Sequence, residues 1–110
     1  MGKIERYQSA VSDLLKTYER PDDTVETHII TDDQHHQYQL LRSWRTDSEA
    51  LKLRIVLHFQ IKPDGKVWIL ANWTEDDVAQ SLVERGVAKS DIVLGFQPEY
   101  VRPHSGYAVA

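Results

Sequence analysis

A run of alternating apolar and polar side chains, followed at once by a turn signal, constrains the fold of this chain most strongly. Its apolar members are Leu51, Leu53, Ile55, Leu57, Phe59 and Ile61. This period of two is typical of a strand with one face in the core. Pro63 and Gly65 then occupy the second and fourth positions of a predicted type I turn. The chain should therefore reverse into a strand over residues 66–71, and the two strands form an antiparallel hairpin.

The predicted return strand is apolar on both sides. Val67, Ile69 and Ala71 share one face, while Trp68 and Leu70 share the other. Two further strands are predicted earlier, over residues 24–31 and 37–46, where β-branched and aromatic side chains gather. A sheet with two partly apolar faces needs cover on both, from helices or from another subunit.

Two helices are predicted around the strands. Apolar side chains recur at spacings of three and four over residues 3–19. The second helix is expected to begin at Thr74, with Thr74 and Asp77 as a capping box and Trp73 and Val78 as a hydrophobic staple. It should end near Arg85, where Gly86 allows a Schellman closure of residue 87 onto residue 82. Residues 92–96 suit a buried edge segment or short strand.

These elements predict an α+β fold with a twisted antiparallel sheet of four or more strands. One helix precedes the strands and a second follows the central hairpin. The length of 110 residues fits a single domain over residues 1–110. The chain has no cysteine and starts with charged residues, so we expect a cytoplasmic protein without a membrane segment. The net charge of -4 argues against a protein that grips duplex DNA by itself.

The polar residues do not form a catalytic or metal-binding motif. None of the five histidines are paired at the spacings that aim two imidazoles at one ion. Helix capping already explains the acidic run Glu75, Asp76 and Asp77. His104 and Ser105 lack the strand-to-helix context of an activated serine. The sequence therefore predicts no catalytic residue, no metal and no cofactor.

Aromatic and basic residues are the remaining candidates for a binding surface. The tryptophans and tyrosines either fill the core or meet a partner. Trp68 is the best candidate for a residue outside the core, because it lies opposite the Val67 and Ile69 face and either meets a second covering layer or anchors a partner. Four basic residues can gather beside the hairpin as a small patch, which is either a solvated strand face or a phosphate contact. They are Arg42, Arg45, Lys52 and Arg54.

The order of short motifs in the second half of the chain resembles the XisI family. The matching positions are Trp44, His58, Asp64-Gly65-Lys66-Val67-Trp68-Ile69, Thr74-Glu75, Gly86, Asp91-Ile92-Val93-Leu94-Gly95-Phe96, Pro98, Arg102 and Ala108-Val109-Ala110. The resemblance is strong from His58 onward and rests mainly on pattern before it. Four positions depart from residues that are common in the family. They are Ser43, Leu70, Asn72 and Asp77.

The resemblance implies a function that the residues alone do not. XisI proteins are small proteins of cyanobacterial type associated with excision of a DNA element from a nitrogen-fixation gene region. The chain is accordingly expected to be a non-enzymatic accessory factor that binds a XisH-like nuclease-type protein, in a regulatory or antitoxin-like role, and contacts DNA through its partners. The predicted partner-binding residues are Trp44, Trp68, Arg102 and Tyr107. Self-association into a homo-oligomer is also expected. The alternatives are direct nucleic-acid binding and a small ligand-binding or enzymatic domain.

Overall fold

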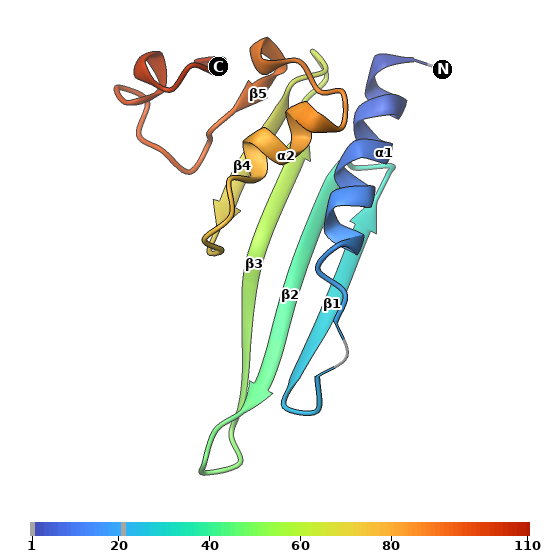
Figure 1. Cartoon of the computed structure of the whole chain (residues 1–110), viewed down its shortest axis with the longest axis vertical. Helices are drawn as coiled ribbons and strands as arrows, with labels where there is room; N and C mark the ends of the chain where they lie inside the picture. The colour runs from blue at the N-terminus through green and yellow to red at the C-terminus, as the bar shows by residue number, and fades with distance from the viewer. Residues whose placement is uncertain (1, 21) are drawn as a thin grey trace.

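A mixed sheet carries both helices on one of its faces (Figure 1). The computed structural model describes residues 2–20 and 22–110. Over these residues its elements are α1 (Lys3–Lys16), β1 (Val25–Asp32), β2 (Gln37–Arg45), β3 (Leu51–Ile61), β4 (Val67–Asn72), α2 (Val78–Glu84) and β5 (Ile92–Val93). The strands lie in the order β1-β2-β3-β4-β5. All neighbouring pairs are antiparallel except β4 and β5, which are parallel. The predicted α+β class, with a helix before and a helix after the central hairpin, is confirmed.

Helix α1 packs its apolar stripe onto the sheet and ends three residues before the predicted position. Its buried residues are Tyr7, Ala10, Val11, Leu14 and Leu15. At the C-terminus, the Thr17 hydroxyl and the Thr17 N–H both donate to the Leu14 carbonyl oxygen, at 2.6 and 3.1 Å. These contacts tighten the last turn, which ends the α-helix at Lys16.

The prediction that β3 has one continuous core face is wrong. Leu40 of β2 pairs with Leu57, but its neighbour Leu41 pairs with Ile55, so Val56 is an extra residue in β3. Such a bulge moves the side chains beyond it to the other face of the sheet. Leu57 is fully buried on the helix side, whereas Ile55 is 41% exposed and Leu53 61% exposed. The alternating run therefore crosses from one face to the other at Val56.

The predicted turn between β3 and β4 is confirmed. The Gly65 N–H donates to the Lys62 carbonyl oxygen at 2.8 Å, and Gly65 has a φ of 87°. A second irregularity follows in β4, because Ala71 pairs with His58 whereas Ile69 pairs with Phe59. Leu70 is the extra residue there, so Ala71 does not share the core face of Ile69 as predicted.

Helix α2 begins later than predicted and has a different N-cap. Asp77 is the N-cap, and its carboxylate accepts from the Gln80 N–H at 3.1 Å. The Thr74 hydroxyl instead donates to Asn72 Oδ1 at 2.6 Å. Trp73 is 68% exposed. The predicted capping box and hydrophobic staple are therefore wrong, since Thr74 belongs to the turn before the helix.

Replacing Asp77 with alanine is expected to lower the free energy of unfolding by about 0.5–2 kcal/mol, the usual loss for a side chain that caps a helix. Thermal unfolding followed by circular dichroism measures the effect. Glu75→Ala removes a carboxylate two residues earlier and serves as the matched control. An equal loss in both variants would mean that charge, and not the cap, stabilises the helix.

The predicted closure after α2 is confirmed. The Val87 N–H donates to the Leu82 carbonyl oxygen, and the Gly86 N–H donates to the Val83 carbonyl oxygen, each at 3.0 Å. Gly86 has a φ of 97°. This Schellman geometry turns the chain toward β5, the predicted buried edge strand. The loop before β5 is tied to α1, because the Tyr7 hydroxyl donates to Asp91 Oδ2 at 2.6 Å.

Candidate functional site

The sheet face opposite the helices exposes large apolar side chains, which we call the open face. Its members are Ile30 at 48% exposure, Leu51 at 60%, Leu53 at 61% and Ile55 at 41%. Figure 1 shows β2 and β3 extending well beyond the helices and β4. β4 pairs with β3 only from Leu57 onward, so residues 51–55 have β2 as their paired neighbour. An apolar patch of this kind on a small protein is typical of an interaction surface.

The structure brings two of the four predicted partner-binding residues, Trp68 and Arg102, into contact with each other. The Arg102 guanidinium lies 5.1 Å from the Trp68 ring centroid, and the Lys62 ammonium also lies 5.1 Å from it. Tyr107 packs against the core, with the Lys89 ammonium 6.0 Å from its ring. Burial raises the pKa of the Tyr107 hydroxyl. Trp68 is half-buried beneath Lys62 and Arg102, and its role in partner binding stays a prediction.

The fourth predicted residue, Trp44, lies on the helix side of β2 with most of the predicted basic patch. Arg42 is directly opposite Arg54, and Trp44 is directly opposite Lys52. Arg45 is on the other face of the sheet, where its guanidinium donates to the Glu49 carbonyl oxygen at 2.9 Å. Three of the four basic residues therefore gather on one face, and Arg45 does not join them.

A cavity of about 360 Å³ lies among these residues, and we call it the Arg–Trp cavity. It is lined by Arg20, Asp22, Val25, Thr27, Arg42, Trp44, Arg54, Val56 and Trp73. The Arg54 guanidinium lies 5.2 Å from the Trp73 ring centroid. Arg42, Trp44 and Arg54 were candidates from the sequence, whereas Trp73 and Arg20 were not. Trp73 was assigned to a helix staple, and nothing in the pattern linked Arg20 to strands that lie later in the chain.

Comparison with known proteins identifies the family. A family model described as XisI protein matches residues 1–109. This chain belongs to the XisI family. The XisI resemblance seen in the sequence is thereby confirmed. None of the curated proteins matched the chain.

Two solved XisI structures from Anabaena variabilis have the same fold as this XisI-family protein. One is a XisI-like protein that is 37% identical, with a TM-score of 0.86, and the match covers 97% of this chain and 99% of the other. The second is the fdxN element excision controlling factor XisI, which is 28% identical with a TM-score of 0.83. That match covers 99% of this chain and 100% of the other.

The four positions that were expected to depart from the XisI pattern have local structural roles in this protein. Ser43 is 8% exposed, and its hydroxyl lies 3.0 Å from His28 Nε2. The Asn72 amide donates to the Asp76 carbonyl oxygen at 3.0 Å. Asp77 caps α2, and Leu70 is the extra residue of the β4 bulge. Ser43, Asn72 and Asp77 therefore each make a local hydrogen bond, and Leu70 forms the β4 bulge.

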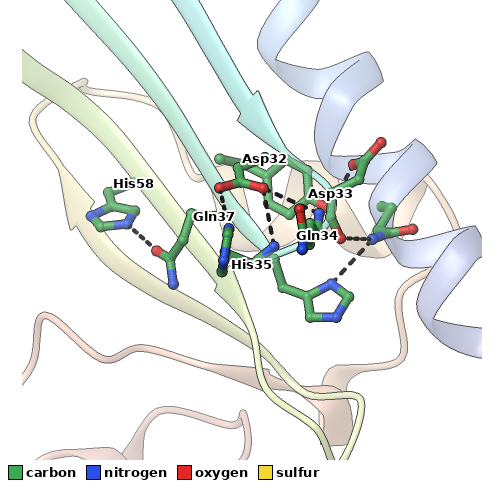
Figure 2. Close-up of polar contacts among 9 residues, drawn as sticks. Asp32, Asp33, Gln34, His35, Gln37 and His58 are labelled. Carbon is green, nitrogen blue, oxygen red and sulfur yellow. Dashed lines mark hydrogen bonds and ion pairs between the residues drawn. The ribbon is translucent and has the colours of Figure 1, made fainter.

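The histidines do not assemble a metal site. Figure 2 shows His35 turned toward Asp32, whose carboxylate lies 2.7 Å from His35 Nδ1 and accepts from the His35 N–H at 3.0 Å. Hydrogen bonds from His35, its backbone N–H first, lower the pKa of Asp32. Among residues 2–20 and 22–110, no three histidine, aspartate or glutamate side chains are grouped around a common point suited to an ion.

Neither helix in that part of the chain is long and apolar enough to cross a membrane.

His58 gives the protein a pH-dependent stability. Its Nε2 lies 2.7 Å from Gln37 Oε1, as Figure 2 shows, and burial lowers its pKa below the ordinary value of 6.5. The unfolded chain therefore binds a proton at a higher pH than the folded chain does, and stability falls as the pH drops below about 6.5.

Between pH 7 and pH 5, the free energy of unfolding should fall less in His58→Gln than in the wild type. The reason is that glutamine does not titrate, whereas histidine in the unfolded chain takes up a proton below about pH 6.5. Chemical denaturation at a series of pH values measures the difference. His104→Gln is the control, since His104 is exposed. Identical pH profiles for the wild type and His58→Gln would contradict the assignment.

Proposed function

We propose that this protein is a non-enzymatic controlling factor for excision of a DNA element and that it acts by binding a nuclease-type protein. The observation that carries this proposal is the full-length similarity to the fdxN element excision controlling factor XisI, with 28% identity and a TM-score of 0.83. The match covers 99% of this chain and 100% of that chain, so the likeness extends over the whole length of both chains compared. The cytoplasm, where the DNA lies, is the proposed site of action.

The titratable side chains support a role without catalysis. Tyr38 and Tyr18 have a pKa raised by burial, and each hydroxyl donates to a carboxylate, Asp33 at 2.9 Å and Asp76 at 2.7 Å. The first pair fixes the turn between β1 and β2, and the second joins the segment after α1 to the turn before α2. Groups with shifted pKa values in an enzyme instead converge on a substrate cleft. We therefore assign the function to surfaces and not to a reacting group.

The open face is the proposed docking surface for the nuclease-type partner, which the XisI resemblance implies is XisH-like. Trp68 lies on the same sheet face, opposite Gln60 in the β3–β4 register. Gln60 pairs with Gln37 and Leu53 pairs with Ser43. The distance from Gln37 to Ser43 along β2 is about 20 Å. The open face and the C-terminal cluster around Trp68 can thus contact one partner over a standard-sized interface.

Co-expression with the nuclease-type protein, followed by size-exclusion chromatography with light scattering, tests the proposal. We expect a single complex whose nuclease activity differs from that of the partner alone. Inhibition would indicate an antitoxin-like role, and stimulation an activating one. The chain is also run alone, because a homo-oligomer would cover the open face with a second copy. Two separate species and an unchanged nuclease activity would overturn the proposal.

A further inference from the structure

We propose that the Arg–Trp cavity binds a nucleotide, with the phosphate between the guanidinium groups of Arg42 and Arg54 and the base against an indole ring. The cavity lies on the helix side of the sheet, past the end of α1. It is therefore on the opposite side of the sheet from the open face. The inference is independent of the protein partner proposed above.

The positive charges in the cavity are the first argument. Arg42 and Arg54 are direct cross-strand neighbours, an arrangement that repels unless an anion lies between them. Arg20 adds a third guanidinium. In the part of the chain that the structure describes, none of the three forms an ion pair with a carboxylate. In a chain with a net charge of -4, this concentration of free positive charge marks an anion site.

Asp22 is the one carboxylate in the lining, and its hydrogen bonds are directed elsewhere. Its Oδ1 accepts from the Thr24 N–H at 2.8 Å and from the Thr24 hydroxyl at 2.7 Å. These hydrogen bonds lower the pKa of Asp22, the side-chain bond first. The carboxylate thus stabilises the turn into β1, and the guanidinium groups remain available to a ligand.

The two indole rings are the second argument, and they distinguish a nucleotide from a simple anion. Trp73 is 68% exposed although it is the kind of side chain that a small domain normally buries. Arg54 lies over its ring, and Trp44 lines the same cavity. Proteins that bind single nucleotides of a strand stack the base on an exposed aromatic ring and hold the adjoining phosphate with nearby arginines.

The size of the cavity fits this ligand class. Its volume of about 360 Å³ is at the small end of the range of about 300–1,000 Å³ for small-molecule sites. That volume suits one base with its sugar and phosphate. The nucleotide can be free or can be one unit of a single strand, because both present the same base and phosphate.

Isothermal titration calorimetry on the full chain tests the inference and separates the two sources. The probes are deoxyadenosine 5′-monophosphate, a single-stranded oligodeoxyadenylate, deoxyadenosine and inorganic phosphate. We expect the monophosphate to bind more tightly than either deoxyadenosine or phosphate. Equal affinities for the monophosphate and the oligonucleotide would identify a free nucleotide as the ligand. Tighter binding of the oligonucleotide, with a steep salt dependence, would identify a single strand.

Matched variants locate the site. Arg42→Gln and Arg54→Gln are each expected to weaken nucleotide binding about tenfold, the effect of losing one charge-assisted contact. Arg45→Gln removes the same charge from the other face of β2 and should leave the affinity unchanged. Trp73→Leu changes an exposed residue, so it should fold and still weaken binding of the base.

Three results would overturn the inference. They are no saturable binding of any nucleotide probe, equal binding of phosphate and nucleotide, and equal weakening by Arg45→Gln. Thermal unfolding of each variant accompanies the titrations. If one arginine variant fails to fold, the other arginine variant and Trp73→Leu still decide the question.

Discussion

Leu53→Asp is expected to abolish the complex with the nuclease-type partner, with a loss of affinity of at least about 100-fold. Leu53 is 61% exposed in the centre of the open face, so aspartate replaces it in the free protein without disturbing the core. Docking would bury the new carboxylate at the centre of the interface without a hydrogen-bonding or charged group to pair with it, which costs several kcal/mol of binding free energy. A loss of about 2.7 kcal/mol corresponds to a 100-fold loss of affinity. Analytical size exclusion of the co-expressed pair measures the loss.

Ser9→Asp is the matched control for this substitution. Ser9 is an exposed residue of α1, on the helix side of the sheet, and the change adds the same single negative charge. It should leave the complex intact. If Leu53→Asp binds the partner as well as Ser9→Asp does, the open face is not the docking surface.

Gly95→Val is expected to destabilise the protein by about 1–3 kcal/mol, the usual cost of forcing extra atoms into a packed site. A Cβ atom at Gly95 would lie 2.9 Å from Trp68 Cε3 and 3.2 Å from the Ile69 carbonyl oxygen. The backbone there is anchored by the Phe96 N–H, which donates to the same carbonyl oxygen at 3.0 Å. The valine should therefore push the C-terminal segment off Trp68.

Thermal unfolding and limited proteolysis read out this displacement. Gly95→Val should unfold at a lower temperature, and new cleavage sites should appear after residue 96. Gly2→Ala is the control, because the nearest atom to its added Cβ is Glu5 Oε1 at 3.9 Å. Wild-type stability in Gly95→Val would show that the C-terminal segment is not packed on Trp68.

Local signals in the sequence were sufficient to predict most of the elements. The Pro63 and Gly65 turn and the Gly86 closure depend on a few neighbouring residues and on backbone geometry, so they were predicted correctly. The start of α2 was wrong because Thr74 and Asp77 are both good N-cap residues. The choice between them depended on Asn72, which binds the Thr74 hydroxyl.

The open face could not be predicted, because the alternation of β3 is unbroken through the bulge. Sequence alone gives Leu53 and Leu57 the same face, and only the pairing with β2 reveals that Val56 is an extra residue. Of the apolar residues of β3 assigned to the core, Leu51, Leu53 and Ile55 are consequently exposed. The same shift moves Arg54 to the helix side, where it meets Arg42 and Trp73.

The frequency of DNA-element excision in a heterologous bacterium measures the proposed controlling role itself. The strain carries the element, its recombinase and the nuclease-type partner, with or without this chain. We expect excision to depend on the chain and Leu53→Asp to behave like its absence, whereas Ser9→Asp should behave like the wild type. An excision frequency that is the same with and without the chain would contradict a controlling role.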